Sequence, residues 1–196
     1  MKLLGTTTSP YTRKVRILLR AMGKQHDLVD TRTDKGAAAL AEVAPLAKIP
    51  VLVDDDGQVI PDSALIASWL WATEPGVLRA AGFDFDPAHW DDRKLRVVVE
   101  GALDAAINHY YLRQDGFADA GYIAKQRQRV DRTLTWLDAR VGPFRRPLGG
   151  AALSLGVALD WITFRHLVEL ARWPNLAAFR EAWTTAGVGA GTEPRE

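Results

Sequence analysis

The fold is decided by Thr8-Ser9-Pro10-Tyr11-Thr12-Arg13-Lys14-Val15, the stretch that joins a predicted strand to a predicted helix. The short apolar run before it predicts a strand over residues 2–7. Apolar residues recur after it at helical spacing, which predicts a helix over 10–22. Ser9 is a good N-cap, and Pro10 suits the first helical position. A hydroxyl is therefore expected at the positive end of a helix, where an anion can be held, although the same pair also suits an ordinary helix start.

Composition limits the class of protein. The chain has 196 residues with 47% hydrophobic content, enough for one large domain or two small ones. The net charge is +1 and both signs are interspersed, so no nucleic-acid partner is expected. No apolar run is long enough to cross a bilayer, and the N-terminus lacks the long apolar region of a signal peptide. A cytoplasmic protein without a membrane partner is expected.

The chain contains no cysteine, which excludes disulfides, thiolate metal sites and cysteine nucleophiles. Any thiol chemistry must therefore use a thiol supplied by a ligand. The four histidines are far apart in the sequence, without the spacing of metal ligands, so no metal site is expected.

The first 73 residues follow the pattern βαβ, α, then ββα. Gly23 ends the first helix, and 26–30 is a second strand that would pair parallel to the first. An Ala-rich helix is predicted over 37–43, and an Asp-Gly turn predicts a hairpin of 48–53 with 58–60. Asp62 or Ser63 would cap a third helix that runs to residue 73.

The rest of the chain is expected to be helical. A turn-rich stretch at 76–86 is interpreted as a linker between domains 1–75 and 87–196. The third predicted helix of the second domain is apolar on all sides, so it is expected to be central and buried. The tail after residue 186 is too rich in glycine to be ordered by its own propensity. The predicted helices cover about 87–113, 118–140, 154–171 and 175–183.

This order of elements resembles the glutathione S-transferase superfamily along nearly the whole chain. The resemblance is closest to a bacterial serine-type subgroup marked by Ser-Pro-Tyr. It implies a thioredoxin-like α/β N-terminal domain followed by an all-α C-terminal domain, the glutathione S-transferase (GST) fold. The motifs that carry it are Ser9-Pro10-Tyr11, Arg13-Lys14-Val15, Lys48-Ile49-Pro50-Val51-Leu52, Asp62-Ser63, Glu100-Gly101-Ala102-Leu103-Asp104-Ala105 and Ala158-Leu159-Asp160-Trp161.

The resemblance implies a role for Ser9. Ser9-Pro10-Tyr11-Thr12 stands where glutaredoxin-like relatives carry Cys-Pro-Tyr-Cys, which argues against disulfide exchange. A serine can instead donate a hydrogen bond to a glutathione thiolate, and the helix N-terminus would also favour the anion. A thiolate is the nucleophile, so a lower thiol pKa raises reactivity. Ser9 is therefore the candidate catalytic residue, with Tyr11 and Thr12 as alternative hydroxyls and a plain helix cap as the competing interpretation.

The resemblance also implies a glutathione site. Pro50 is expected after a cis peptide bond, so that the Ile49 backbone pairs with the cysteinyl part of glutathione like an added strand. The competing interpretation is a trans proline at a sheet edge. Ser63 would bind the γ-glutamyl carboxylate at a helix N-terminus, and Asp62 the ammonium group.

Two further groups of side chains are expected near the ligands. Lys48 or Lys35 could pair with the glycyl carboxylate of glutathione. Tyr11, His109 and Arg113 are candidates for the pocket of a second, electrophilic substrate, with Tyr110 at a similar depth.

One departure from the family concerns the buried helix of the second domain. Members of the superfamily usually begin it with Ser/Thr-x-x-Asp, a capping box. Ser154-Leu155-Gly156-Val157 has no acid at that place, and the segment looks several residues short. The helix is therefore expected to begin late, with Gly156 weakening its first turn by up to about 1 kcal/mol.

Three functions are open from the sequence. The first is a glutathione transferase, a homodimer that conjugates glutathione to small electrophiles. The second is glutathione-dependent reduction of organic peroxides by the same thiolate. The third is a non-catalytic binding or interaction protein of the same fold.

Overall fold

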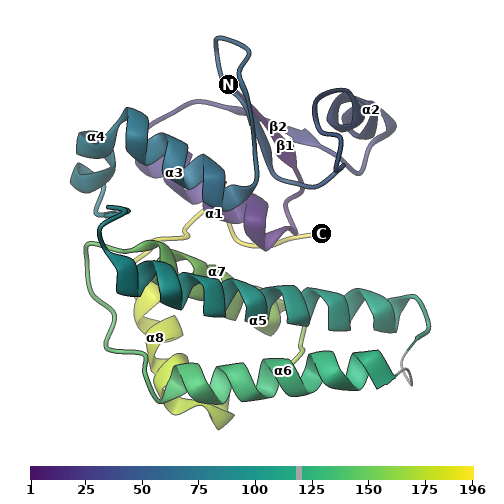
Figure 1. The fold of residues 1–196 in the computed structure, drawn as a ribbon, viewed down its shortest axis with the longest axis vertical. Coiled ribbons are helices and arrows are strands. Elements are labelled where there is room, and N and C mark those ends of the chain that lie inside the picture. The colour runs from purple at the N-terminus through teal and green to yellow at the C-terminus, as the bar shows by residue number, and fades with distance from the viewer. Residues whose placement is uncertain (118–120) are drawn as a thin grey trace. The chain divides into compact units, whose positions relative to one another are not determined.

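The computed structural model describes residues 1–117 and 121–196, and its contacts divide them into two units. The first unit contains residues 1–86 and 189–196, and the second contains 87–188. Figure 1 shows the elements of both units. In the first unit they are β1 (Lys2–Gly5), α1 (Pro10–Ala21), β2 (Asp27–Asp30), α2 (Asp34–Val43), β3 (Val51–Val53), β4 (Val59–Pro61), α3 (Ser63–Thr73) and α4 (Pro75–Ala80).

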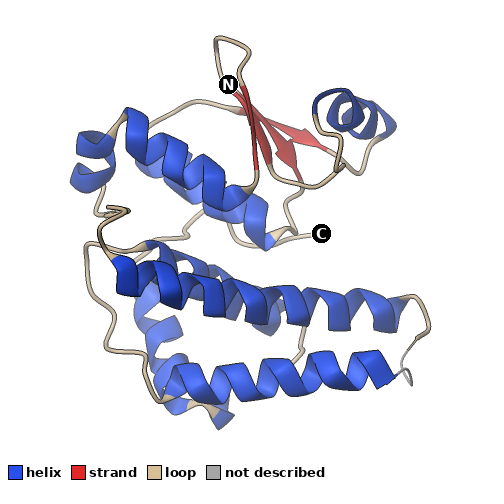
Figure 2. Cartoon of the chain, viewed as in Figure 1, coloured by secondary structure: helices blue, strands red, loops and turns tan. Residues whose placement is uncertain are grey.

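A four-stranded sheet in the order β2-β1-β3-β4 organises the first unit. β1 pairs parallel with β2 and antiparallel with β3, and β3 pairs antiparallel with β4. Figure 2 shows α2 on one side of this sheet and α1 with α3 on the other. The thioredoxin-like α/β domain and the helical domain expected from the sequence are both confirmed.

The two central strands are apolar because helices cover both of their faces. Leu3, Val51 and Leu52 are fully buried, and Leu4 is 3% exposed. Pro50 comes directly before Val51 and lies just outside β3. The central strand therefore contains no proline, which would remove a ladder hydrogen bond.

The stretch expected as a linker, 76–86, belongs entirely to the first unit. All of α4 except Pro75 lies within it, and Leu78 is fully buried. Phe83 is 1% exposed and packs beside Phe85, with 5.9 Å between ring centroids. These apolar side chains give the turn-rich stretch a packed structure that its glycines and prolines did not predict.

The C-terminal tail is held on α1 by tertiary contacts, which its glycine-rich sequence alone did not predict. Thr192 is 3% exposed, and its hydroxyl accepts a hydrogen bond from Nε of Arg13 at 3.3 Å. Arg16 Nη1 donates to the Thr192 carbonyl at 3.3 Å. Long-range contacts thus order a segment that has little intrinsic propensity for structure.

The second unit is helical. α5 packs against α6 and α7, and α7 is buried along almost its whole length, as its all-round apolarity predicted. The start predicted for α6 at residue 118 lies outside the described residues. The elements are α5 (Trp90–Gln114), α6 (Gly121–Asp138), α7 (Gly150–Phe164), η1 (Leu170–Arg172) and α8 (Pro174–Thr185).

The predicted bounds of α7 were wrong at both ends. The helix begins at Gly150 and ends at Phe164, so it begins earlier than expected rather than late. Its N-cap residue, Gly149, has no side chain that could accept a hydrogen bond from the first turn. The cap comes from α5, where Asp92 accepts from the amides of Gly150 and Ala151 at 2.9 and 3.1 Å.

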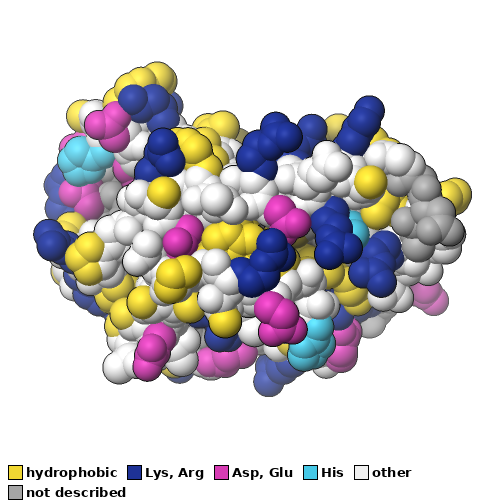
Figure 3. All heavy atoms as spheres, turned by 90° about the horizontal axis from the view of Figure 1, so that it is seen from below, with side chains coloured by type: hydrophobic (Ala, Val, Ile, Leu, Met, Phe, Trp, Pro, Cys, Tyr) yellow, Lys and Arg dark blue, Asp and Glu magenta, His cyan; other side chains and the backbone are white. Residues whose placement is uncertain are grey.

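Charge is mixed on the face of the molecule that Figure 3 shows. In Figure 3, Lys and Arg side chains are interspersed with acidic and hydrophobic ones. Among the described residues, no helix combines the length and apolarity needed to span a membrane.

Candidate functional site

The N-terminus of α1 carries Ser9 as its N-cap. The Ser9 hydroxyl oxygen accepts from the Thr12 amide at 3.2 Å, and the Ser9 amide donates to the Thr6 hydroxyl at 3.2 Å. The side chain is half-buried. Accepting a hydrogen bond leaves the hydroxyl proton available, so Ser9 can cap the helix and still donate to an anion.

The two alternative hydroxyls are placed differently. Thr12 is fully buried against β1, and a Cβ added at Gly5 would lie 2.3 Å from Thr12 Oγ1. Its hydroxyl therefore cannot reach a ligand in this structure. Tyr11 is half-buried, and Lys14 Nζ lies 5.1 Å from the centre of its ring.

The sheet register brings three predicted segments to one edge. Leu4 of β1 faces Val51 of β3, and Val51 faces Pro61 of β4. The loop after β1, the Ile49–Pro50 pair before β3 and Asp62 after β4 therefore leave the sheet at the same end. The Ile49–Pro50 peptide bond is cis, as expected, and the Asp62 amide donates to the Pro50 carbonyl at 3.1 Å.

Asp62 caps α3 from an unusual backbone conformation. Its φ of 70° is disfavoured for a residue with a Cβ, and such residues cluster at functional sites. Its Oδ1 accepts from the amides of Ala64 and Leu65 at 2.8 and 3.1 Å. Ser63, the first residue of α3, is 3% exposed. The helix end thus combines a carboxylate at its cap with the amide and hydroxyl of Ser63.

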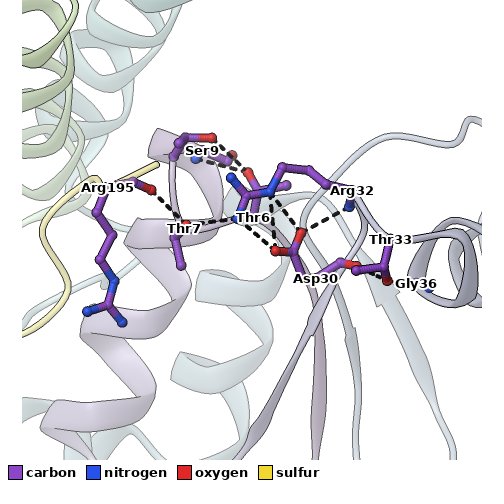
Figure 4. Close-up of polar contacts among 9 residues, drawn as sticks. Thr6, Thr7, Ser9, Asp30, Arg32, Thr33, Gly36 and Arg195 are labelled. Carbon is purple, nitrogen blue, oxygen red and sulfur yellow. Dashed lines mark hydrogen bonds and ion pairs between the residues drawn. The ribbon is translucent and has the colours of Figure 1, made fainter.

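Figure 4 shows a polar network beside this edge that the sequence did not predict. Arg32 pairs with Asp30 through two nitrogens, with Nη2 to Oδ2 at 2.7 Å and Nε to Oδ1 at 3.1 Å. Hydrogen bonds from Arg32 hold the pKa of the Asp30 carboxyl below its ordinary value. Arg32 Nη2 also donates to the Thr7 hydroxyl at 3.4 Å, and Thr7 donates to the Arg195 carbonyl at 2.8 Å. The C-terminal tail thus contacts Thr7, which lies two residues before Ser9 in the sequence.

The two candidate lysines are both exposed. Lys35 lies in the first turn of α2, and Lys48 lies in the loop before Pro50. Neither position gives the side chain a fixed direction. Arg32 follows β2 and is held in place, but Asp30 already neutralises it.

The candidates for a second-substrate pocket divide between the units. Tyr11 belongs to the first unit, whereas His109 and Arg113 lie on α5 in the second. Arg113 is exposed, but His109 is only 8% exposed. His109 lines a small cavity of about 30 Å³ together with Arg127 and Asp131 of α6, and its Nδ1 has no hydrogen-bond partner among the described residues.

His109 predicts a pH dependence of stability. Burial, followed by the charges of Arg113 and Arg127, lowers its pKa below 6.5, while Asp131 and an Ile123 backbone hydrogen bond act in the opposite direction. The folded state therefore favours neutral His109, so its contribution to stability is complete above pH 6.5 and is lost as the pH falls below it. Urea unfolding of wild type and His109→Gln is expected to show a smaller loss on acidification in the variant. His166→Asn, at an exposed histidine, is the control, and parallel pH curves for wild type and His109→Gln would contradict the assignment.

No group of three or more histidine or acidic side chains in the described part of the chain is arranged to hold a metal ion. The chemistry of the edge described above is that of anion and ammonium recognition, with hydroxyl, amide and carboxylate groups at two helix N-termini.

Comparison with known proteins shows which solved structures have a similar fold. Residues 8–73 match the family model for the glutathione S-transferase N-terminal domain. A glutathione S-transferase of Methylobacillus flagellatus KT, solved with glutathione bound, is 28% identical, with a TM-score of 0.83 and 99% of each chain covered. The chain has the glutathione S-transferase fold.

Two further proteins are similar to this chain. A glutathione transferase family member from Pseudomonas fluorescens Pf-5 with bound glutathione is 29% identical, covers 100% of this chain and 99% of its own, and has a TM-score of 0.81. The uncharacterized GST-like protein YibF of Escherichia coli (strain K12) is 27% identical over 85% of this chain and 84% of its own. The fold is thus shared with proteins crystallised with glutathione, and the sequence is similar to that of an uncharacterized GST-like protein.

Within the GST fold, the residues that sequence reasoning missed are Arg32, Asp30 and the tail. Asp30-Thr31-Arg32 has only the weak signal of two opposite charges two residues apart, at the end of a strand. The tail carries no local signal, because its position depends on partners about 180 residues away in the chain.

Proposed function

We propose that this protein is a glutathione transferase, in which the first unit binds glutathione and Ser9 stabilises its thiolate. The observation that carries the proposal is the common edge of the sheet, where the Ser9 loop, the cis Ile49–Pro50 pair and the Asp62–Ser63 helix start meet. Solved proteins of the same fold were crystallised with glutathione, which supports the choice of ligand.

The edge suits the three parts of glutathione. The amide and hydroxyl of Ser63 would take the γ-glutamyl carboxylate, and Asp62 the neighbouring ammonium group. The backbone of Ile49 would pair with the cysteinyl residue in the manner of an added strand. The glycyl carboxylate would lie toward Lys35, Lys48 or Arg32.

The thiol would then lie at the N-terminus of α1. A hydrogen bond from the Ser9 hydroxyl, together with the partial positive charge of the helix end, would lower the thiol pKa. The thiolate attacks the electrophilic atom of a small molecule, the new carbon–sulfur bond forms, and the leaving group departs with its electron pair.

Replacing Ser9 tests the role of the hydroxyl. In Ser9→Ala, kcat/KM for conjugation to a chromogenic aryl halide is expected to fall by about tenfold or more, because a charge-assisted hydrogen bond is worth about 1.5 to 3 kcal/mol. The rise of rate with pH should also move to higher pH, since the thiol pKa is no longer lowered. Steady-state kinetics across pH would measure both effects.

Thr12→Val is the matched control, since it removes a hydroxyl on the same helix that is fully buried. It is expected to keep the wild-type rate and pH profile. Undiminished activity in Ser9→Ala would refute the catalytic role and leave Ser9 as a helix cap.

A non-catalytic protein of the same fold is the second candidate. It is favoured by the cap hydrogen bond to Thr12, which accounts for Ser9 without any chemistry. Absence of turnover with aryl halides and with organic peroxides, despite glutathione binding, would select it. Turnover of peroxides alone would select the peroxide reductase.

The proposed assembly is a homodimer. Leu65 on α3 is 52% exposed, and Trp90 and Val97 on α5 are 59% and 68% exposed, which offers apolar surface for a second copy. Light scattering would give the mass of the particle, and a monomer would contradict this assembly.

A further inference from the structure

A basic hollow lies beside the C-terminal half of α1, within the first unit. It has a volume of about 350 Å³ and is open to solvent. Its charged or titratable lining side chains are Arg16, Arg20, Lys24 and His26, and its described lining contains no acidic residue. The ordered tail forms another wall through Gly191 and Thr192. The volume is in the range that holds small ligands.

The positive charge of this hollow is only partly balanced. Lys24 pairs with Glu74, and Glu193 of the tail accepts from the Gly191 amide at 3.0 Å. Arg16 donates to the Thr192 carbonyl, which carries no formal charge. The Arg20 side chain has no hydrogen bond or ion pair with another described residue. Arg16 and Arg20, one helical turn apart, therefore both line the hollow, and its described lining contains no carboxylate. The charge of Glu193 acts on both guanidinium groups from outside that lining.

Repulsion between arginine side chains also indicates an excess of positive charge at the hollow. Burial lowers the pKa of Arg16, and the charges of Arg195, Arg13 and Arg20 lower it further, against the opposing effect of Glu193. Like charges four residues apart on a helix are destabilising. A bound anion would remove this repulsion.

The C-terminal tail packs closely against the Arg20 side chain. Gly191 has a φ of +74°, and a Cβ at this position would lie 2.2 Å from Arg20 Nη1. The next residue, Thr192, is anchored by Arg13 and Arg16. The wall of the hollow is therefore fixed against the guanidinium group.

We propose that this hollow binds a small molecule through a multiply charged oxyanion, a phosphate or sulfate group held between Arg16 and Arg20. The planar guanidinium fork can donate to two oxygens of such a group, and a phosphate or sulfate has enough oxygens to accept from both arginines at once. Arg20 is eleven residues from Ser9, which is about 16 Å along the helix. The hollow is thus separate from the proposed glutathione site and does not depend on it.

The test is a titration of the whole protein with inorganic phosphate at constant ionic strength, followed by the amide NMR signals of Gly191 and Thr192. Wild type is expected to show saturable shifts of both signals. Arg20→Met should weaken the affinity at least tenfold, while Arg132→Met, at an exposed arginine of α6, should keep it. The amide spectrum of each variant also reports whether it is folded.

Sodium sulfate and glycerol 3-phosphate form two further arms. Tighter binding of the ester would identify a phosphorylated small molecule as the ligand class, and equal binding of sulfate and phosphate would identify the free oxyanion. Lack of saturation in wild type, or equal affinity in folded Arg20→Met, would overturn the proposal.

Discussion

Replacing Asp92 with alanine is expected to lower the free energy of unfolding by about 2 to 4 kcal/mol, because one carboxylate satisfies two amides of a buried helix. Asp92 lies on α5, and its two oxygens accept from Gly150 and Ala151 at the start of α7. The N-cap Gly149 has no side chain of its own, and a Cβ there would lie 2.1 Å from Asp92 Oδ1. The missing capping box is thus replaced by a cap from another helix.

Urea unfolding followed by circular dichroism would measure this loss. Asp91→Ala is the matched control, since the Asp91 carboxylate is 96% exposed and, among the described residues, pairs with Lys94 alone, in the same helix at 2.7 Å. It should change stability by less than about 0.5 kcal/mol. Equal effects of the two variants would show that the cap from Asp92 contributes nothing.

Gly156→Ala is expected to destabilise the protein by about 1 to 3 kcal/mol, although alanine is the better helix former by up to about 1 kcal/mol. Gly156 lies in the middle of α7, where a Cβ would come within 2.4 to 2.6 Å of three ring carbons of Trp183. Trp183 is 1% exposed, and its Nε1 donates to Asp160 at 3.2 Å. The ring therefore cannot move without shifting α8.

Gly101→Ala is the matched control in the same unit. Gly101 lies in the interior of α5 and is exposed, with nothing within 4 Å of an added Cβ. It is expected to stabilise the protein by roughly 0.5 to 1 kcal/mol through helix propensity alone. Thermal unfolding should thus show shifts of opposite sign, and stabilisation by both variants would contradict the close contact with Trp183.

Local signals in the sequence were sufficient to predict most of the helices and strands of the first unit. Ser9 with Pro10, the Asp-Gly hairpin and Asp62 each act on residues within a few positions, so their helix caps and turns could be predicted. Proline at residue 50 likewise marked the start of β3. In these elements, the residues that form the caps and turns are also close to one another in the sequence.

The errors in the helical unit have a non-local cause. The start of α7 was misplaced because its cap comes from Asp92, 58 residues earlier in the chain. Gly156 looked like a weak first turn because the Trp183 ring that requires it lies on α8. Similarly, the tail is ordered by Arg13 and Arg16 rather than by its own residues.

The sequence predicted the individual residues of the candidate site but not the hydrogen bonds that connect the neighbouring polar side chains. The geometry places Ser9, Pro50 and Asp62 at one edge of the sheet, where the resemblance implied they would act. The pairing of Arg32 with Asp30 and its link to the tail needed the structure.

The central claim is that glutathione binds at the start of α3, and calorimetry with glutathione on wild type and Ser63→Ala tests it most directly. Ser68→Ala is the matched control, since this serine on the same helix is exposed and its hydroxyl donates to the Ala64 carbonyl at 2.9 Å, its single side-chain hydrogen bond within the described part of the chain. Wild type and Ser68→Ala are expected to bind with the same affinity, and Ser63→Ala about tenfold or more weakly, because a carboxylate loses one charge-assisted hydrogen bond. Absence of binding in wild type, or unchanged affinity in Ser63→Ala, would contradict the proposed site.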